Sequence, residues 1–372
     1  MRLIIERSPL LDALTHVTSV VERRNTIPIL SNVLIAAKGK LVSLTATDLD
    51  IEVVETVAAD VAQDGATTVS AHMFHDIVRK LSDGAQVELS LGPDEGRLAL
   101  VSGPAKFALQ VLPPDDFPDL SAGEMSHAFE MPAADLKKLI DKTRFAISTE
   151  ETRYYLNGIY LHAAESGGRQ MLRAVATDGH RLAQMELPLP KGAEDMPGVI
   201  VPRKTVSELH KLLENSSAPV KIELSTSKIR LSLGDVVLTS QLIDGTFPDY
   251  GRVIPEGNNK VLNVSNTDFA KSVDRVSTLS SDKGRAVKLK AGDGKLVLSV
   301  NNPDSGSATE ELSADYSDED IEIGFNARYL LDISSQIESE NVQFLLSDPG
   351  SPIMVHDDGD TGALYVLMPM RV

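Results

Sequence analysis

One phrase recurs along this chain at a fixed distance, and that repetition constrains the fold more than any single motif. The letters ATDLD at residues 46–50 return as ATDGH at residues 176–180, and FPDL at 117–120 returns as FPDY at 247–250. Both phrases are displaced by the same 130 positions. Two independent landmarks with one offset indicate an internal repeat, which has to be recognised before any fold is assigned.

A third and fainter copy follows the first two. VNNPD at residues 300–304 stands where the Thr-Asp phrase is expected, and MPM at 368–370 closes the copy where the Phe-Pro-Asp phrase is expected. The chain is therefore interpreted as one architectural unit written three times. The expected domains are residues 1–124, 125–253 and 254–372. Their junctions fall near 121–127 and 251–260, where small, polar, Gly and Pro residues are frequent.

Each copy predicts the same elements in the same order. Apolar residues recur at helical spacing in two segments of every copy, and alternating strands lie between and after them. The six expected helical segments are 6–24, 70–81, 132–147, 202–214, 266–285 and 325–338. A hairpin follows the first helix of each copy, and Gly39, Gly167 and Gly294 supply the positive φ that its tight turn needs. Each unit is predicted to be α+β, an antiparallel sheet with two helices on one face.

The charge of the chain argues against binding nucleic acid by bulk attraction. The 54 acidic residues outnumber the 36 basic ones, for a net charge of −18. Trp is absent and aromatic residues make up only 4%, so base-stacking platforms are not expected. The expected helical segments nevertheless carry a small net positive charge, which leaves the rest strongly acidic. One interpretation is that helices simply hold Lys and Arg well; the other is that they face one polyanionic surface and contact phosphates weakly.

Several kinds of chemistry are excluded by residues that the chain lacks. With no Cys, it has no disulfide, no thiolate metal site and no Cys nucleophile. A glycine-rich phosphate loop, a His-Glu-x-x-His pair and a Gly-x-Ser-x-Gly elbow are also missing. No signal peptide and no apolar stretch of roughly 18 residues is present, which predicts a cytoplasmic protein without membrane contact. We expect no catalytic residue, no metal and no cofactor.

Two acidic patterns still need an interpretation. Asp178 and His180 both exchange protons, but they lie two positions apart with no Ser nucleophile nearby. The favoured interpretation is a turn in which the Asp178 side chain accepts backbone hydrogen bonds. The run HDDGD at residues 356–360 lacks the ligand spacing of a calcium loop, and we interpret it as a solvated hairpin tip.

Five motifs then occur in one order along the chain. They are RYYLNG at 153–158, ATDGHRL at 176–182, VPRK at 201–204, FPDY at 247–250 and MPMR at 368–371. Together they resemble the bacterial DNA polymerase III beta subunit, the sliding clamp, over essentially all 372 residues. The resemblance implies a head-to-tail homodimer of three-domain subunits that closes into a ring, with the helices lining a hole around duplex DNA. It also implies a non-catalytic processivity factor that topology retains on DNA.

The resemblance assigns three groups of residues. The residues expected to face DNA are Arg24, Arg153, Tyr154, Tyr155, Arg203, Lys204 and Arg252. The residues expected to form a groove for partner peptides are Leu156, Thr177, Gly179, His180, Arg181, Leu182, Pro248, Val253, Val366, Met368, Pro369 and Met370. Phe107 and Leu279 are expected at the dimer interface. Ordinary surface ion pairs remain an alternative for the DNA-facing set, and core packing for Phe107, Leu279, Met368 and Met370.

The partners implied by the resemblance are duplex DNA without sequence preference, the DNA polymerase III catalytic subunit, the clamp loader and other clamp-binding replication and repair proteins. A cytoplasmic, nucleoid-associated location follows. Two alternatives stay open. The first is a repeat-built scaffold that binds peptides and never encircles DNA. The second is an enzyme built around Asp178 and His180, although no cofactor motif in the sequence supports it.

Overall fold

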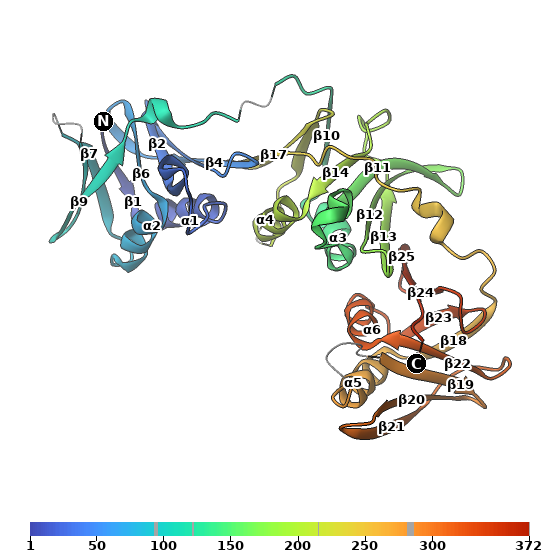
Figure 1. Ribbon diagram of the computed structural model, residues 1–372. Helices are drawn as coiled ribbons and strands as arrows, with labels where there is room; N and C mark the ends of the chain where they lie inside the picture. Colours follow the sequence, from blue (N-terminus) through green and yellow to red (C-terminus); the bar gives the residue numbers. More distant parts are fainter. Residues whose placement is uncertain (93–95, 121–122, 215, 281–285, 372) are drawn as a thin grey trace. The chain divides into compact units, whose positions relative to one another are not determined.

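The computed structural model describes residues 1–92, 96–120, 123–214, 216–280 and 286–371. The chain divides into two compact units, which are described separately below. The first unit consists of Met1–Leu136, Pro190–Pro197 and Ser207–Leu242. The second unit consists of Lys137–Leu189, Gly198–Val206 and Ile243–Val372. Figure 1 shows the elements of both in chain order.

The first and second repeats contain equivalent elements. Those of the first repeat are β1 (Arg2–Glu6), α1 (Arg7–Thr18), β2 (Asn32–Lys38), β3 (Leu41–Thr47), β4 (Ile51–Ala58), β5 (Asp60–Gln63), β6 (Gly65–Ser70), α2 (Ala71–Lys80), β7 (Gln86–Leu91), β8 (Arg97–Ser102) and β9 (Ala105–Leu112). Those of the second are β10 (His127–Met131), α3 (Ala133–Asp141), β11 (Gly158–Ser166), β12 (Arg169–Thr177), β13 (Arg181–Pro188), β14 (Val199–Pro202), α4 (Arg203–Leu213), β15 (Val220–Leu224), β16 (Lys228–Leu233) and β17 (Val236–Gln241). Among its described residues, the second repeat lacks only a counterpart of the short strand β5.

The third repeat follows the plan of the second. Its elements are β18 (Lys260–Ser265), α5 (Asn266–Ser277), β19 (Ala286–Gly292), β20 (Lys295–Asn302), β21 (Gly306–Ser313), β22 (Ile321–Asn326), α6 (Ala327–Ser334), β23 (Asn341–Leu346), β24 (Ile353–Asp357) and β25 (Asp360–Leu367). Short 3-10 turns lie at η3 (Arg144–Ala146), η4 (Glu151–Leu156) and η5 (Tyr250–Val253). The three expected α+β repeats are therefore confirmed as antiparallel strands with two helices each.

The sheets run from one repeat into the next. In the first unit, 13 strands follow the order β10-β15-β16-β17-β4-β3-β2-β6-β9-β8-β7-β1-β5. In the second unit, eight strands follow the order β14-β11-β12-β13-β25-β24-β23-β18, and four follow the order β21-β20-β19-β22. Two antiparallel pairs join different repeats: β17 with β4, and β13 with β25. By position in the repeat, β4 and β13 correspond to β21, whereas β17 and β25 correspond to β9.

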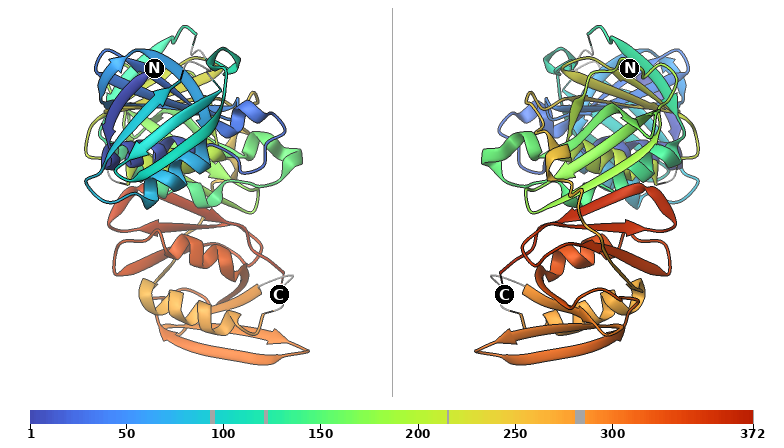
Figure 2. Two further views of the ribbon diagram at one scale, coloured as in Figure 1. Left: turned by 90° about the vertical axis from the view of Figure 1, so that its left-hand side faces the viewer. Right: turned by 90° about the vertical axis from the view of Figure 1, so that its right-hand side faces the viewer.

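The helices cover their sheets with apolar faces at helical spacing. In α1, Leu10, Leu14 and Val17 are buried, and α1 packs against α2 in the first unit. In the second unit α5 packs against α6, β20 and β21, and Figure 2 shows these two helices along one side of the C-terminal strands. Phe269 of α5 meets Phe344 of β23 with ring centroids 5.1 Å apart. Among the described helices, none is long and apolar enough to cross a membrane.

The helices are shorter than the sequence pattern predicts. The first, expected over 6–24, ends at Thr18, where the Ser19 hydroxyl donates to the His16 carbonyl and closes the last turn. The one expected over 266–285 ends at Ser277, and residues 281–285 lie outside the described part of the chain. Apolar spacing continues past Thr18 through the buried Val20 and Val21, and past Ser277 through the half-buried Leu279, so periodicity alone cannot locate a helix terminus.

Local turn chemistry agrees with the sequence in the hairpins but not in the last acidic run. The positive φ expected at Gly39, Gly167 and Gly294 is confirmed, at 65°, 58° and 73°. In contrast, the solvated tip expected at residues 356–360 is wrong for Asp357, which is only 2% exposed. Its carboxylate accepts the backbone N–H groups of residues 338, 339 and 359, and these bonds replace the water that it loses.

A substitution at Gly158 tests how closely β11 and β14 approach. A Cβ at this position would lie 2.2 Å from the Val201 carbonyl oxygen, in the register where Gly158 faces Pro202. We expect Gly158→Ala to lower the free energy of unfolding by about 2–3 kcal/mol, because backbone on both strands has to move. Urea unfolding followed by circular dichroism measures this. The matched change Gly92→Ala, where no atom lies within 4 Å, should leave stability within about 0.5 kcal/mol.

Candidate functional site

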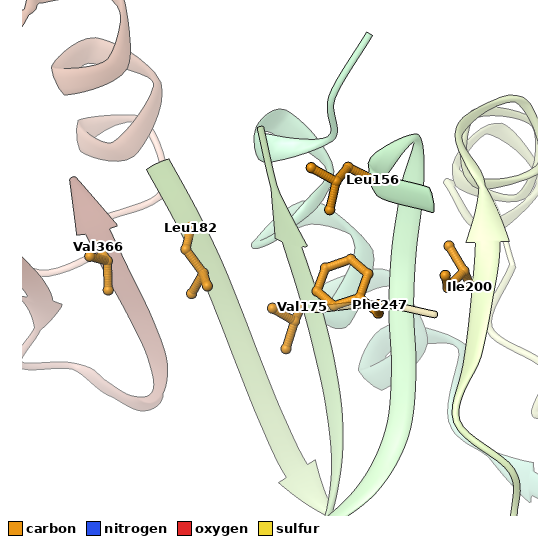
Figure 3. Packing of buried hydrophobic residues seen from close by; sticks show 6 residues of the cluster. All are labelled: Leu156, Val175, Leu182, Ile200, Phe247 and Val366. Carbon is orange, nitrogen blue, oxygen red and sulfur yellow. The ribbon is translucent and has the colours of Figure 1, made fainter. Parts of the chain in front are cut away.

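A buried apolar cluster lies where the second and third repeats share a sheet. Its members are Leu156, Val175, Leu182, Ile200, Phe247 and Val366. Figure 3 shows their side chains in the second unit: Val175, Leu182, Ile200 and Val366 come from strands, Leu156 from η4 and Phe247 from the segment before η5. The pairing of β13 with β25 sets Leu182 directly opposite Val366. Three residues of the expected groove, Leu156, Leu182 and Val366, are thus brought together in one cluster.

Exposed apolar side chains border this cluster along the chain. Val253 is 49% exposed beside Ile254, which packs against the cluster, and Met368 is 41% exposed two residues after Val366. Pro248 is exposed next to the buried Phe247. Apolar surface that stays in water beside a packed apolar floor is typical of interaction sites. Core packing therefore does not account for the Met368 side chain.

Backbone hydrogen bonds hold the segment that follows β25. The Met368 N–H donates to the His180 carbonyl over 2.9 Å, and the Met370 N–H donates to the Gly324 carbonyl over 2.8 Å. The segment is therefore fastened to a turn of the second repeat and to β22 of the third. This places the expected groove residues at 366–370 beside those at 177–182.

The recurring phrase forms the same turn in each repeat. The Asp178 carboxylate accepts the backbone N–H groups of His180 and Arg181, and Asp48 accepts those of Asp50 and Ile51. In the third repeat the Asn302 side chain accepts the N–H of residue 304. The turn predicted for Asp178 is confirmed, and it explains why the phrase recurs. The Asp178 carboxylate accepts these hydrogen bonds and also pairs with Arg181, so it has a structural role in the turn.

Arg181 is buried and fixes the turn to the third repeat. Its guanidinium donates to the Asp178 carboxylate, to the Asp332 carboxylate of α6 at 2.5 Å, and to the Phe145 carbonyl at 2.6 Å. The same group lies 4.3 Å from the centroid of the Tyr329 ring. An Arg held by two carboxylates and one ring is well compensated for the loss of water. Arg181 thus borders the cluster as a structural joint between β13, η3 and α6.

The expected DNA-facing residues of the second repeat gather on short turns. Arg153 and Tyr154 lie on η4, where Arg153 pairs with Glu150 and donates to the Asp178 carbonyl. The hydrogen bond from Arg153 holds the pKa of the exposed Glu150 carboxyl below its ordinary value. Tyr154 is 52% exposed, whereas Tyr155 packs against the apolar cluster.

The other expected DNA-facing residues occupy separate elements. Arg203 and Lys204 begin α4, and the exposed Arg24 lies after α1 in the first unit. Arg252 lies on η5 with its side chain 83% exposed, paired to Asp249 at 2.8 Å. Several of these cations already have acidic neighbours, so each is only partly available to phosphates.

The two residues expected at a dimer interface differ in environment. Phe107 lies on β9 and is 36% exposed. Leu279 follows α5 and is half-buried, and its carbonyl accepts a hydrogen bond from the Asn302 amide at 2.9 Å. Within the described ranges, no group of three or more His, Asp or Glu side chains is placed to hold a metal ion.

Comparison with known proteins covers the whole chain. Family models match residues 1–121, 130–249 and 251–371, as the N-terminal, central and C-terminal domains of the DNA polymerase III beta subunit. The beta sliding clamp of Caulobacter vibrioides is 53% identical over 372 residues, with 100% of both chains covered, and that of Escherichia coli is 39% identical over 376. A Bartonella birtlesii sliding clamp bound to griselimycin superposes with a TM-score of 0.97 at 55% identity, with 100% of both chains covered.

The chain belongs to the DNA polymerase III beta subunit family. The resemblance proposed from five sequence motifs is thereby confirmed. A second structure supports it: the Caulobacter crescentus beta sliding clamp with bound polyethylene glycol has a TM-score of 0.98 at 53% identity, with coverage of 100% of this chain and 99% of that one.

Sequence reasoning missed part of the beta-subunit site. Val175, Ile200 and Phe247 complete the apolar cluster, yet only Phe247 belonged to a recurring phrase. Tyr329 and Asp332, which hold Arg181, lie on α6 and carried no motif. Their role depends on a contact between residues about 150 positions apart in the chain, which no local pattern encodes.

Replacement of Arg181 tests its role as a joint. Lys has no planar fork and cannot reach both carboxylates and the Phe145 carbonyl at once. We expect Arg181→Lys to lower the free energy of unfolding by about 2 kcal/mol, because Asp332 and Asp178 lose a shared buried partner. Chemical denaturation at fixed protein concentration measures this. The exposed Arg169 on β12 provides the control, and Arg169→Lys should unfold at the wild-type midpoint.

Proposed function

We propose that this chain is a sliding clamp: copies of it encircle duplex DNA and tether the replicative DNA polymerase, so that synthesis becomes processive. The observation that carries the proposal is that all three repeats match the three domains of the beta subunit family in order. Sliding clamps from several bacteria match the chain over their full length. A clamp contributes no chemistry of its own, so the chain acts as a non-catalytic subunit of the polymerase.

The sheet order supports closure of the ring as a head-to-tail homodimer. β4 and β13 each pair with the last strand of another repeat, β17 and β25. Their counterpart β21 is an edge strand with no neighbour on its outer side in the described sheet. The strand that corresponds to β17 and β25 is β9, where Phe107 leaves apolar surface in water. A partner subunit that supplies β9 to β21 repeats the same junction, with Leu279 nearby after α5.

Weak, non-specific contact with phosphates suits a ring that slides. α4 has three basic residues and one acidic one, and α2 also has more Lys and Arg than Asp and Glu. Arg24, Arg153, Tyr154, Tyr155, Arg203, Lys204 and Arg252 are the proposed DNA-facing residues. Ion pairs such as that of Arg252 with Asp249 weaken the hold of each on phosphate, and topology then provides the retention.

The apolar cluster and its exposed border are the proposed groove for partner peptides. Its floor comes from Leu156, Leu182 and Val366, and its rim comes from Val253 and the segment at 368–370. A flexible, exposed Met side chain adapts to differing ligands, which suits a groove used by several partners. The polymerase catalytic subunit, the clamp loader and repair proteins are the proposed occupants.

Two further assignments complete the proposal. The domain boundaries are 1–124, 125–253 and 254–372, and the protein acts in the cytoplasm at the nucleoid, where its DNA lies. The alternative of a peptide-binding scaffold that never encircles DNA is not favoured, because the family match extends over every repeat and not only over the groove.

Retention on circular DNA tests the clamp function. After loading by the clamp loader onto nicked circular DNA, the wild-type protein should stay bound at moderate salt and leave when the DNA is linearised. Leu279→Asp should abolish retention, because a buried unpaired charge opens the dimer interface. Gel filtration of the DNA complexes measures both, and light scattering should show Leu279→Asp as a monomer. The control Leu41→Asp, at a 51% exposed hairpin position, should be retained.

Equal retention on linear and circular DNA would instead indicate a binder held by charge, and would overturn the ring. A wild-type protein that is monomeric at micromolar concentration would do the same.

Substitution at the chain's last residues tests the groove. A double change, Met368→Ala with Met370→Ala, should weaken binding of a fluorescein-labelled peptide carrying one Gln and spaced Leu residues by at least about tenfold, because anchors of this kind contribute about 2 kcal/mol. Fluorescence anisotropy measures the affinity. Dimer mass and thermal unfolding should stay at wild-type values, and Met73→Ala, at a 54% exposed Met of α2, should bind normally. Undiminished peptide binding would place the groove elsewhere.

A further inference from the structure

The hydroxyl of Tyr250 joins two strands of the second repeat to the segment that borders the groove. It lies 3.0 Å from the His162 Nε2 of β11 and 3.0 Å from an Arg173 guanidinium nitrogen of β12. Tyr250 is the first residue of η5, the short turn that ends at Val253. All of these residues belong to the second unit.

While the His162 imidazole is neutral, the three groups allow one arrangement of hydrogens. Arg173 can only donate, so the Tyr250 oxygen accepts from it and keeps its own hydrogen for His162. His162 Nδ1 lies 2.9 Å from the Ala163 carbonyl, which can only accept, so Nδ1 carries the imidazole hydrogen. Nε2 is then the unprotonated nitrogen that accepts from Tyr250. The relay runs from Arg173 through Tyr250 to a neutral His162.

Both ends of the relay are anchored in the sheet. The Glu186 carboxylate of β13 accepts from Arg173 at 2.7 Å and 2.9 Å, and its other oxygen accepts from the Ser166 hydroxyl. At the other end, the His162 ring stacks on Tyr160 with centroids 4.5 Å apart. Half-buried side chains with satisfied partners on three strands form a rigid support.

The same support fixes the segment on both sides of Pro248. The Phe247 ring lies on Tyr160 at a centroid distance of 4.9 Å and an interplanar angle of 8°. Tyr250 is held three residues later by its hydroxyl. The exposed Pro248 lies between these two attachments, and the exposed Val253 is carried at the end of η5. The position of both groove residues therefore depends on the relay.

We propose that Arg173, Tyr250 and His162 are positioning residues of the partner-peptide groove, which hold η5 in its binding conformation only while the His162 imidazole is neutral. This inference rests on the proposed groove function. None of the three side chains is required to touch the peptide. They act by fixing the border of the groove before the peptide binds. Less conformational entropy is then lost on binding.

Acid is expected to release the support. Burial lowers the pKa of His162; the bond to the Ala163 carbonyl opposes this, and the neighbouring Arg173 charge adds to the lowering. The charged or titratable groups that face the imidazole are Arg173 on β12, Tyr160 on its own strand and Tyr250 on η5, with Glu186 behind Arg173. Because the folded pKa is depressed, the stabilisation is present above histidine's ordinary pKa and is lost as pH falls through the lower folded value. Protonated Nε2 no longer accepts from Tyr250.

The decisive experiment compares peptide affinity at two pH values. With the fluorescein-labelled Gln-and-Leu peptide, Tyr250→Phe should bind about five-fold more weakly than wild type at about pH 7.5, the worth of a neutral hydrogen bond. At a lower pH, below the folded pKa of His162, the difference should shrink toward none, because the wild-type relay is then broken as well. Every other groove residue is the same in both proteins, so its pH dependence cancels in the ratio.

A second variant gives the opposite prediction. In His162→Gln the amide oxygen accepts from Tyr250 and the amide nitrogen donates to the Ala163 carbonyl, and neither titrates. This protein should bind as wild type at about pH 7.5 and should lose less affinity than wild type at the lower pH. The matched control is Tyr316→Phe, which removes a hydroxyl that donates to the Glu319 carbonyl in the third repeat, and it should follow the wild-type profile.

The inference would be overturned if the ratio of wild-type to Tyr250→Phe peptide affinity were the same at both pH values. It would also be overturned if the peptide affinity of His162→Gln followed the wild-type pH dependence. Failure of the groove itself looks different, because then wild type does not bind the peptide or the Met368 and Met370 double variant binds undiminished. Should Tyr250→Phe fail to fold, His162→Gln alone decides the question.

Discussion

Backbone pairing between repeats is the constraint on which the rest of the structure depends. Each repeat builds two blocks of strands, and the outer strand of a block has unsatisfied N–H and C=O groups unless another strand covers it. The chain covers two such edges internally, by pairing β17 with β4 and β13 with β25. The second of these pairings also creates the site, since Leu182 and Val366 face each other only because β13 and β25 are neighbours in one sheet. The apolar cluster composed from two repeats, which underlies the proposed groove, is therefore a by-product of how sheet edges are satisfied.

Local chemistry was predictable from the sequence, and long-range contact was not. The turn at Asp178 followed from a phrase whose side chain bonds to its own backbone two and three residues on, so all the required atoms lie within one short stretch. The hairpin glycines followed in the same way. The helix ends were predicted less well, because apolar residues continue the helical spacing beyond Thr18 and Ser277.

The same distinction applies to the site. The resemblance grouped Leu156, Leu182 and Val366, which the cluster unites, but nothing in the sequence linked Arg181 to Asp332 or Tyr250 to Arg173. Asp357 shows the converse error. Its acidic neighbourhood is typical of an exposed tip, yet three backbone N–H groups compensate its burial. Whether a charged residue is buried depends on donors from other segments, and composition does not reveal them.

The backbone bonds of the segment after β25 have a consequence for the order of events during synthesis. The groove border needs the Met368 N–H on the His180 carbonyl and the Met370 N–H on the Gly324 carbonyl. The ribosome makes residues 177–182 long before residues 366–370, so a nascent chain displays the Asp178 turn without its partner segment. Unfinished chains therefore lack the complete proposed groove. If this groove recruits partners, its dependence on a late segment restricts recruitment to chains whose translation has passed residue 370.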